Sequence, residues 1–253
     1  ILSDFSCVFN NGDKAVVIGE EGNGKSTLLK WIYHPELIEE YCDAEGERLV
    51  SGEVLGYLSQ ELPTEDQDKS VYEFFSEKDY FWNQASRFQL SPEFFYQDQK
   101  MATLSGGEKV KAQLMRILFS EPTALLLDEP SNDVDIETLE TLEELILNWD
   151  KIVIYISHDE TLIERTANKI IHIEQIHRKT KSRYCIANMS YLEYLKKRSS
   201  EMENQARQAA DERRQKQIRD EKYQRIYQSV EHAQAVITRQ NPSGGRLLKK
   251  KMH

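Results

Sequence analysis

The sequence has no long apolar run and only three cysteines. No stretch approaches the ~20 consecutive apolar residues that span a bilayer, so we predict a soluble chain without membrane insertion. Cys7, Cys42 and Cys185 are widely separated and outside any C-x-x-C pattern, which predicts reduced thiols in a cytoplasmic protein and excludes a disulfide framework. No secretory signal peptide is visible, although the chain opens at Ile1 instead of methionine.

Acidic and basic residues are unevenly distributed along this chain of net charge −10. Residues 1–195 carry 18 basic and 36 acidic side chains, whereas the 58 residues from Lys196 onward carry 15 basic and 7 acidic ones. An acidic body with a basic tail indicates that the tail, and not the body, contacts a polyanion. The alternative is a solvated charged helix, which would have the same composition.

One glycine-rich segment, residues 19–26, matches the phosphate-loop pattern G-x-x-x-x-G-K-[ST] at every required position. A β-branched run at residues 15–18 precedes it, and a helical segment at residues 27–32 follows it. In such a unit the backbone N–H groups and the helix dipole favour a bound phosphate. Lys25 would reach the β- and γ-phosphates, and Ser26 would ligate Mg²⁺. The alternative, a glycine-rich turn without a ligand, is weaker because the flanking pattern is intact.

Strand-like and helix-like segments alternate along the chain. Apolar alternation over residues 1–13 predicts a half-buried strand that ends at an Asn11-Gly12 turn. Further strands are predicted at residues 52–60, 124–128, 151–156 and 169–173, the last of which closes the series. A small helical insertion is predicted over about 61–104, and longer helices from the segment after Glu108 through Phe119 and over residues 137–149. This alternation predicts an α/β fold with a mixed, largely parallel sheet and helices on both faces.

The C-terminal region, residues 190–253, has a different pattern. It is polar and continuously helical to about residue 240, where Asn241-Pro242-Ser243-Gly244-Gly245 predicts a break before a final basic stretch. Apolar residues at helical spacing form a stripe that needs a partner surface: Tyr223, Ile226, Tyr227, Val230, Ala233 and Ile237. We therefore predict an α/β domain over residues 1–189 and a long charged helical arm over residues 190–253, part of an antiparallel helical hairpin.

Four further motifs follow the phosphate loop: Gln60, the Leu-Ser-Gly-Gly-Glu signature at residues 104–108, the Asp128-Glu129 pair, and His158. Their order resembles that of an ATP-binding cassette (ABC) ATPase over nearly all of residues 1–160. Glu108 stands where transporters more often have Gln. In this position the sequence resembles the ABC-F subfamily of ribosome-associated ATPases. Residues 127–132, residues 190–195 and the charged helix after the cassette also resemble that subfamily.

The resemblance implies a Mg-ATP site. Asp128, at the end of an apolar strand, would hold Mg²⁺ through water, together with Ser26 and Gln60. Glu129 is the candidate general base for the water that attacks the γ-phosphate, and His158 would hydrogen-bond that phosphate. The alternatives are two solvated carboxylates and a structural histidine. The residues predicted to bind ATP are Gly19, Glu20, Glu21, Gly22, Asn23, Gly24, Lys25, Ser26, Thr27, Gln60, Ser105, Gly106, Gly107 and Glu108.

The resemblance also implies partners. Ser105-Gly106-Gly107 opens a helix and, in the family, caps the γ-phosphate of ATP held by an opposite cassette. This sequence has one phosphate loop and one signature, so a complete site needs a second cassette, in the same full-length chain or in a dimer mate. We expect an N-terminal cassette with part of its interdomain linker, acting on the ribosome through a basic arm that contacts rRNA or tRNA.

Several residues depart from the family pattern. Asp133 stands where the subfamily usually has His, Val134 where Leu is usual, and Lys111 where Arg is frequent; the adenine-stacking aromatic residue has no match in the sequence. Two alternatives remain. The ATPase subunit of an ABC membrane transporter has no use for the long arm. A chromosome-maintenance ATPase places a coiled coil between phosphate loop and signature, where only about 80 residues lie here.

Overall fold

The computed structural model describes residues 2–50, 52–76, 85, 88–176 and 181–240. The chain divides into two compact units, with the division between Tyr194 and Leu195. The sequence places this boundary slightly earlier, between residues 189 and 190. The difference arises because the first turn of the last helix packs on the first unit, where Tyr191 and Tyr194 are only 8% and 4% exposed.

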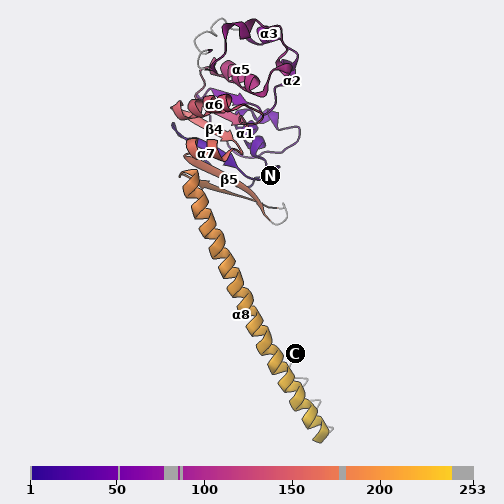
Figure 1. The fold of residues 1–253 in the computed structure, drawn as a ribbon. Helices are drawn as coiled ribbons and strands as arrows, with labels where there is room; N and C mark the ends of the chain where they lie inside the picture. The colour runs from indigo at the N-terminus through magenta and orange to yellow at the C-terminus, as the bar shows by residue number, and fades with distance from the viewer. Residues whose placement is uncertain (1, 51, 77–84, 86–87, 177–180, 241–253) are drawn as a thin grey trace. The chain divides into compact units, whose positions relative to one another are not determined.

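The first unit is built on a six-stranded sheet in the order β2-β3-β4-β1-β5-β6 (Figure 1). Neighbouring strands run parallel except for β5 and β6, which pair antiparallel, so the predicted mixed, largely parallel sheet is confirmed. The strands are β1 (Lys14–Ile18), β2 (Leu55–Leu58), β3 (Ala124–Asp128), β4 (Ile152–Ile156), β5 (Lys169–Ile176) and β6 (Lys181–Ala187).

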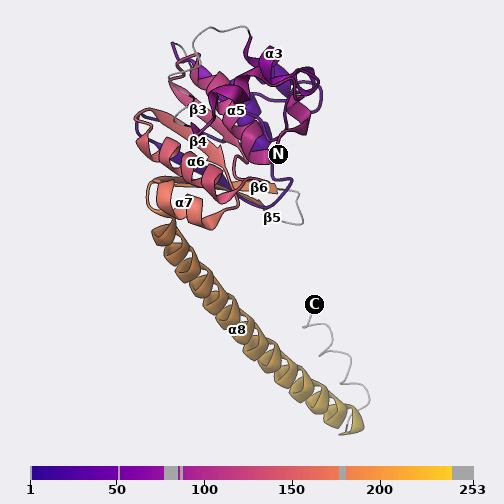
Figure 2. The same cartoon turned by 45° about the horizontal axis from the view of Figure 1, so that its top comes forward.

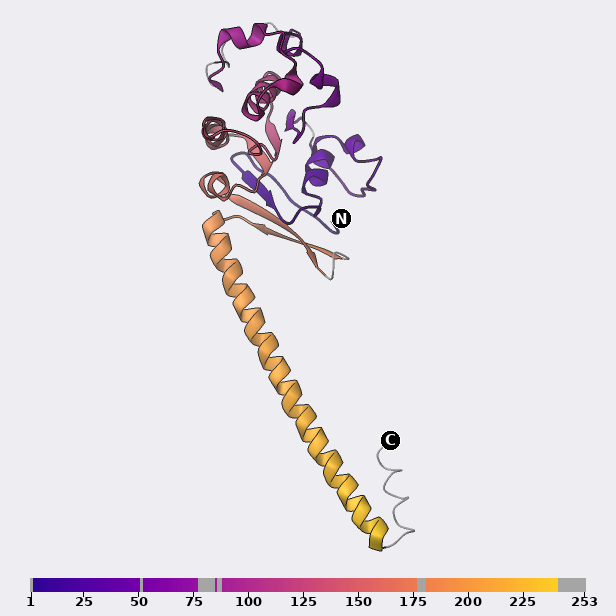
Figure 3. The ribbon, with the colours of Figure 1, turned by 45° about the vertical axis from the view of Figure 1, so that its right-hand side comes forward.

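Helices cover both faces of this sheet because the strands are apolar on both sides. Ala15 and Val17 of β1 pack in one cluster with Leu28 and Leu29 of α1 (Lys25–Tyr33). Val16, on the opposite side of the same strand, belongs to the cluster that includes α6 (Ile136–Asn148) and α7 (Glu160–Thr166). Figure 3 shows α6 and α7 side by side on one side of the strands and α1 on the other. Because β1 to β5 run parallel, their carboxyl ends lie at one edge of the sheet.

A small helical region follows β2 in the chain and includes α5, which packs on β2 (Figure 2). Its core is aromatic, with Phe74 and Phe75 packed near Phe94 and Phe95. Part of the predicted insertion, residues 77–84 and 86–87, lies outside the described residues. The short elements are η1 (Pro35–Leu37), α2 (Thr64–Gln67), α3 (Val71–Phe75), η3 (Pro92–Tyr96) and η4 (Met101–Thr103), and α5 spans Gly106–Leu118.

Three local predictions need correction. Residues 2–13 form no strand: Phe5, Cys7 and Phe9 do alternate with exposed neighbours, but this segment joins no ladder of the sheet. The strand predicted at residues 52–60 is limited to Leu55–Leu58. The series does not end with β5, because β6 adds an antiparallel edge strand whose sequence, with Lys181, Ser182 and Arg183, is too polar to suggest a buried strand.

The second unit contains most of α8 (Tyr191–Gln240), whose first turn belongs to the first unit. This single helix of 50 residues measures ~75 Å at 1.5 Å per residue. The helix begins with a capping box in which Ser190 and Glu193 exchange hydrogen bonds. The stripe residues Tyr223, Ile226 and Tyr227 are at least half exposed. The predicted break at residues 241–245 lies outside the described residues. Of the helices that the structure describes, none combines the length and apolar character needed to cross a membrane.

Candidate functional site

The phosphate loop connects β1 to α1 through three glycines with positive φ. Gly19 has φ 151°, and a Cβ there would lie 2.3 Å from the carbonyl oxygen of Ile173 on β5. Gly22 (φ 77°) and Gly24 (φ 84°) also take conformations that L side chains rarely adopt. The loop therefore packs against β5 in a form that depends on glycine, while Glu20, Glu21 and Gly22 are exposed.

α1 begins without a side-chain cap, whereas Ser70, Ser105, Asp135 and Asp159 cap α3, α5, α6 and α7. The first-turn N–H groups of a helix have no intrahelical acceptor, so an uncapped N-terminus leaves them available to an anion. α1 thus offers backbone donors directly after the glycine loop.

Two buried polar side chains shape the loop from within. Asn23, only 1% exposed, donates from Nδ2 to the Ile173 carbonyl oxygen at 3.1 Å. Lys25 donates from Nζ to the carbonyl oxygens of Gly19 at 2.8 Å and Glu20 at 3.1 Å. Burial lowers the pKa of the Lys25 ammonium, although nearby carboxylates, including that of Glu129, oppose the shift. The lysine ammonium therefore lies against the carbonyl groups of the same loop that would bind a phosphate.

Asp128, at the end of β3, faces the start of α1. It is 2% exposed, and its Oδ1 accepts a hydrogen bond from Ser26 Oγ at 2.8 Å while its Oδ2 accepts one from Tyr57 OH at 3.1 Å. Burial raises the pKa of Asp128, against these two hydrogen bonds. Gln60 is exposed and follows β2, which pairs in parallel with β3 through Leu58 and Leu127. Ser26, Gln60 and Asp128 thus come from three segments at the same sheet edge.

Glu129 and His158 form a second pair at this edge. Glu129 Oε1 lies 3.1 Å from His158 Nε2, and Oε2 is buried without a hydrogen-bond partner. Burial raises the pKa of Glu129, while His158 and Lys25 act in the opposite direction. The backbone of Glu129 has φ 52°, which is rare for a residue other than glycine. A buried carboxylate with one oxygen free of hydrogen bonds is suited to accept a proton.

The signature motif is packed separately from the phosphate loop. Ser105 and Glu108 form a capping box at the start of α5, and Ser105 itself is exposed. A Cβ on Gly106 would lie 1.9 Å from the carbonyl oxygen of Asp133, and one on Gly107 would lie 2.5 Å from Thr138 Oγ1. Both glycines therefore pack against the segment at residues 133–138, while Leu104 is buried in the apolar core and its N–H donates to the Met101 carbonyl oxygen.

The residues at the sheet edge fit a magnesium nucleotide. A serine hydroxyl, an amide and a carboxylate are the hard oxygen ligands that Mg²⁺ accepts, usually through one or two carboxylates together with phosphate oxygens. Within the described residues no group of three or more His, Cys, Asp or Glu side chains is placed to hold a metal ion by itself. The phosphates of a nucleotide would therefore have to complete the ligand set.

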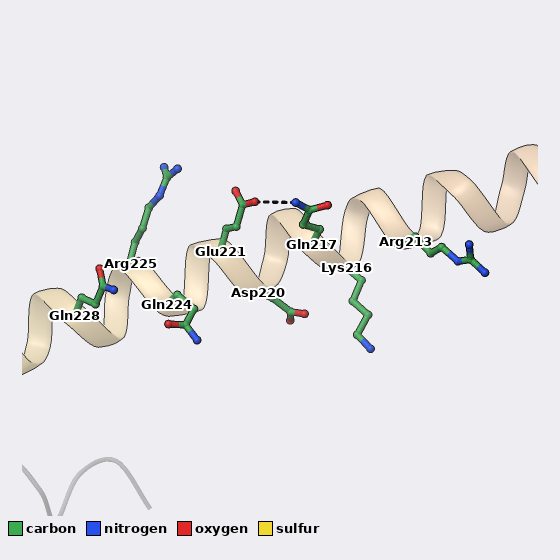
Figure 4. Close-up of a pocket in the computed structure, with 8 residues that line it drawn as sticks. All are labelled: Arg213, Lys216, Gln217, Asp220, Glu221, Gln224, Arg225 and Gln228. Atoms are coloured by element: carbon green, nitrogen blue, oxygen red, sulfur yellow. Dashed lines mark hydrogen bonds between the residues drawn. The ribbon is translucent and has the colours of Figure 1, made fainter.

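A hollow along α8 does not resemble this site. Figure 4 shows that its side chains project from different sides of one helix, and Gln217 Nε2 donates to Glu221 Oε1 at 3.1 Å. Every one of them is exposed, and positive, negative and neutral groups are mixed, so the hollow offers no enclosed surface for a small ligand. Its lining comprises Arg213, Lys216, Gln217, Asp220, Glu221, Gln224, Arg225 and Gln228.

Sequence reasoning missed one group at the site, the hydroxyl of Tyr57. The available signal was its position three residues before Gln60 in the strand predicted at residues 52–60, but the pairing of that strand with the strand of Asp128 is known only from the structure. The hydrogen bond from Asn23 to β5 was also missed, because the sequence does not state which strand borders the loop.

A parallel-stranded sheet with an uncapped helix after a glycine loop, a buried carboxylate and a lysine defines a phosphate-loop nucleotide-binding domain. More specifically, the chain belongs to the ATP-binding cassette family: the family model described as "ABC transporter" matches residues 2–132. It is similar to the ATP-binding protein Uup of Escherichia coli strain K12, with 34% identity over 67% of this chain and 27% of that protein.

It is also similar to the Arabidopsis thaliana "ABC transporter F family member 5", with 33% identity over 64% of this chain and 24% of the relative. The chain thus spans less than a third of the length of these curated relatives, which confirm the predicted ABC-F resemblance of the cassette. Two solved structures share the fold: an RNase-L inhibitor (TM-score 0.55, 21% identity, 72% of this chain and 36% of the other) and an "ATP binding subunit of ABC transporter" (0.54, 19%, 72% and 82%).

Proposed function

We propose that the chain binds Mg-ATP and hydrolyses it as part of an ABC-F type ATPase that acts on the ribosome. One observation carries the nucleotide part. α1 starts without a side-chain cap, and Lys25 and Ser26 in its first turn lie beside Asp128 and Glu129. Backbone donors, a cation, a metal-binding carboxylate and a base are the parts that phosphoryl transfer requires.

Each part has a stated role. The backbone N–H groups from Gly19 to Thr27 bind the phosphates, and Lys25 leaves the loop carbonyls to contact the β- and γ-phosphates. Ser26, Gln60 and Asp128 would hold the Mg²⁺. The metal, when bound, neutralises charge on the phosphate oxygens.

Glu129 takes the proton of the attacking water, for which its unpaired Oε2 and raised pKa are suited. His158 hydrogen-bonds the γ-phosphate, and its contact with Glu129 holds both groups at the same edge. Glu129 and His158 thus act on the attacking water and the γ-phosphate, while the phosphate loop positions the nucleotide.

A second cassette completes the site. Ser105, Gly106 and Gly107 present the N-terminus of α5, which would cap the γ-phosphate of ATP bound to a partner cassette. The exposure of Ser105 supports this role, and the close packing of Gly106 on Asp133 supports a rigid signature motif. The second cassette belongs either to the same full-length protein or to a dimer mate.

The ribosome is the proposed target of the arm in the cytoplasm. The region from Lys196 onward carries a net charge of +8, opposite to that of the cassette, and would bind rRNA or tRNA through phosphate contacts. The ABC-F resemblance supports this partner. The second candidate is an ABC membrane transporter subunit, favoured by the description of the matching family model and opposed by α8.

Cosedimentation with ribosomes across a salt series, with and without Mg-ATP, tests the proposal. A variant with Arg213, Lys216 and Arg225 changed to Gln removes exposed charges from α8 (Figure 4). Because each phosphate contact contributes roughly 0.7–0.9 to the steepness of log K against log salt, we expect weaker association and a slope that is shallower by up to about 2–3. ATP affinity, measured in parallel, should not change.

The matched control replaces the neighbouring acids, Asp220→Asn and Glu221→Gln, on the same stretch of α8. This variant should bind ribosomes at least as well as the unchanged chain and keep its salt slope. Equal slopes for all three proteins would show that the arm is solvated surface, and association with membranes instead of ribosomes would favour the transporter alternative.

A further inference from the structure

Asp128 has a hydrogen-bond donor on each of its two carboxylate oxygens. Ser26 Oγ donates to Oδ1 at 2.8 Å and Tyr57 OH donates to Oδ2 at 3.1 Å. Only the first of these donors belongs to the predicted metal-binding set. An ionised carboxylate that is 2% exposed needs hydrogen bonds to replace lost water, so the second donor has a physical reason to be present.

The sheet register brings Tyr57 to this position. Tyr57 of β2 is paired with Leu126 of β3, and Asp128 lies two residues further along β3. Side chains two residues apart on a strand share a face, so Tyr57 and Asp128 both lie on the face covered by α1. The hydroxyl therefore approaches the carboxylate on the face of the sheet that packs against α1.

A second contact holds the tyrosine ring. Tyr33, the last residue of α1, stacks on Tyr57 with ring centroids 5.1 Å apart and planes at 25°. Ser26, near the first residue of the same helix, contacts Asp128. The path Ser26–Asp128–Tyr57–Tyr33 thus starts and ends on α1, so the helix is joined to β2 and β3 near both of its ends.

We propose that Tyr57 is a positioning residue for the metal half of the Mg-ATP site. Its hydroxyl holds the Asp128 carboxylate so that Oδ1 remains directed at Ser26, while the Tyr33 ring holds the hydroxyl in place. The inference rests on the proposed nucleotide function and deepens it.

Loss of the hydroxyl would leave Oδ2 as a buried acceptor without a partner. Ser26 bonds Oδ1 and could reach Oδ2 only if the carboxylate rotated. Such a rotation would disturb the geometry that Asp128 and Ser26 share toward Mg²⁺. Groups that orient metal ligands in this way typically contribute 10–100-fold to metal affinity. A residue that only filled space would contribute to stability instead, and its ring alone would suffice.

The chain offers a matched control for this distinction. Tyr155 on β4 is fully buried, whereas Tyr57 is half-buried, and the Tyr155 hydroxyl shares one hydrogen bond, with Thr166 Oγ1 at 2.6 Å. Both Tyr57→Phe and Tyr155→Phe remove one oxygen from a sheet tyrosine and leave the ring. Only the first of them changes the surroundings of Asp128.

The experiment measures ATP dissociation constants for the chain in EDTA and in saturating Mg²⁺, and repeats the second with Mn²⁺, whose binding is followed directly by electron paramagnetic resonance. The dissociation constant in EDTA divided by that in Mg²⁺ gives the ratio that reports the metal contribution to ATP affinity. Tyr57→Phe should reduce this ratio roughly 10-fold without changing affinity in EDTA, whereas Tyr155→Phe should leave the ratio unchanged. Ser26→Ala is the positive control, and thermal melting checks that each variant is folded.

Tyr33→Leu provides a second route if Tyr57→Phe is poorly folded, because it removes the stacked ring and keeps the hydroxyl. It should lower the ratio by a smaller factor. An unchanged ratio in a folded Tyr57→Phe, or equal losses in EDTA and in Mg²⁺, would overturn the positioning role alone. If the unchanged chain shows no Mg²⁺-dependent gain in ATP affinity, the proposed function fails and this inference fails with it.

Discussion

The cassette unit and the continuation of α8 show two ways of stabilising regular structure in one chain. The cassette buries apolar side chains on both faces of its sheet, including Leu126, Leu127 and Ile154 at 2% exposure or less. In α8, by contrast, the described residues from Leu195 to Ala233 are exposed, apart from half-buried Arg198 and Val230. The helix depends on Ala, Glu, Gln, Lys and Arg, which are strong helix formers, and on its length.

The difference explains where chemistry is located. Burial raises the pKa of Asp128 and Glu129 and lowers that of Lys25, and all three lie in the cassette. Low-dielectric surroundings of this kind require a packed core on several sides, which an isolated helix cannot supply. The exposed charges of α8 are instead the groups that we propose for contact with rRNA or tRNA.

The largest expected difference between the two units is in the rate of ATP hydrolysis when a single carboxylate, that of Glu129, is removed. Glu129→Gln should slow ATP hydrolysis by the complete protein roughly 10²–10⁴-fold, because a general base contributes that factor, while ATP binding is kept. Turnover and nucleotide affinity are measured on the same preparation. Glu212→Gln makes the same chemical change on the exposed surface of α8 and should leave turnover unaltered. Near-normal turnover with Glu129→Gln would remove the base from the proposed site.

Apolar truncation should distinguish the two units next. Leu126→Ala, at a fully buried position of β3, should destabilise the cassette by about 2–5 kcal/mol because it leaves a cavity. Ile218→Ala, at a position of α8 that is 58% exposed, should change stability by about 0.5 kcal/mol or less. Trp31, Trp82 and Trp149 all belong to the cassette sequence, so tryptophan fluorescence reports its unfolding and far-UV circular dichroism adds α8. Similar costs at both positions would contradict the contrast.

The smallest effect concerns acid. Burial alone would raise the pKa of Asp66, but hydrogen bonds from Lys69 and Arg116 outweigh it and hold that pKa below its ordinary value. A lowered folded-state pKa contributes stability above the unfolded-state value and loses it as pH falls through the folded-state value. Unfolding free energy should therefore decrease below about pH 4. Asp66→Asn should cost about 1–2 kcal/mol at pH 7 and flatten this decrease.

Urea unfolding at a series of pH values measures this dependence. The control is Glu203→Gln on α8, where Glu203 and Arg207 form an exposed pair at 3.7 Å. Because exposed ion pairs contribute little, this variant should keep the pH dependence of the unchanged chain. An Asp66→Asn variant with an unaltered dependence of unfolding free energy on acid pH would show that the contacts of Asp66 with Lys69 and Arg116 do not control the acid sensitivity of the cassette.

Much of the cassette was predictable because its signals are local. Residues 15–18 are an apolar run before a glycine loop, and β3 ends at Asp128 where apolar residues give way to carboxylates. The motif order led to the family before any contact was known. α8 was predictable for the opposite reason, since its polar pattern continues without a breaker from residue 190 to residue 240.

What could not be predicted depends on pairing between distant segments. β6 is polar and becomes a strand only because β5 offers it an edge. Residues 2–13 alternate as a strand would, yet burial of Phe5, Cys7 and Phe9 does not require a ladder partner. Tyr57 reaches Asp128 through the register of β2 with β3, and no property of the tyrosine alone announces that contact.

Glu129 has a consequence for thermal stability. Its left-handed backbone, at φ 52°, costs on the order of 1–3 kcal/mol, and its buried, unpaired Oε2 adds a cost of similar size. Glycine would relieve both. Selection for heat resistance alone would therefore favour loss of this glutamate, whereas selection for turnover retains it, so the two pressures oppose each other at one codon. The cassette's melting temperature is limited in part by the residue that we propose as its base.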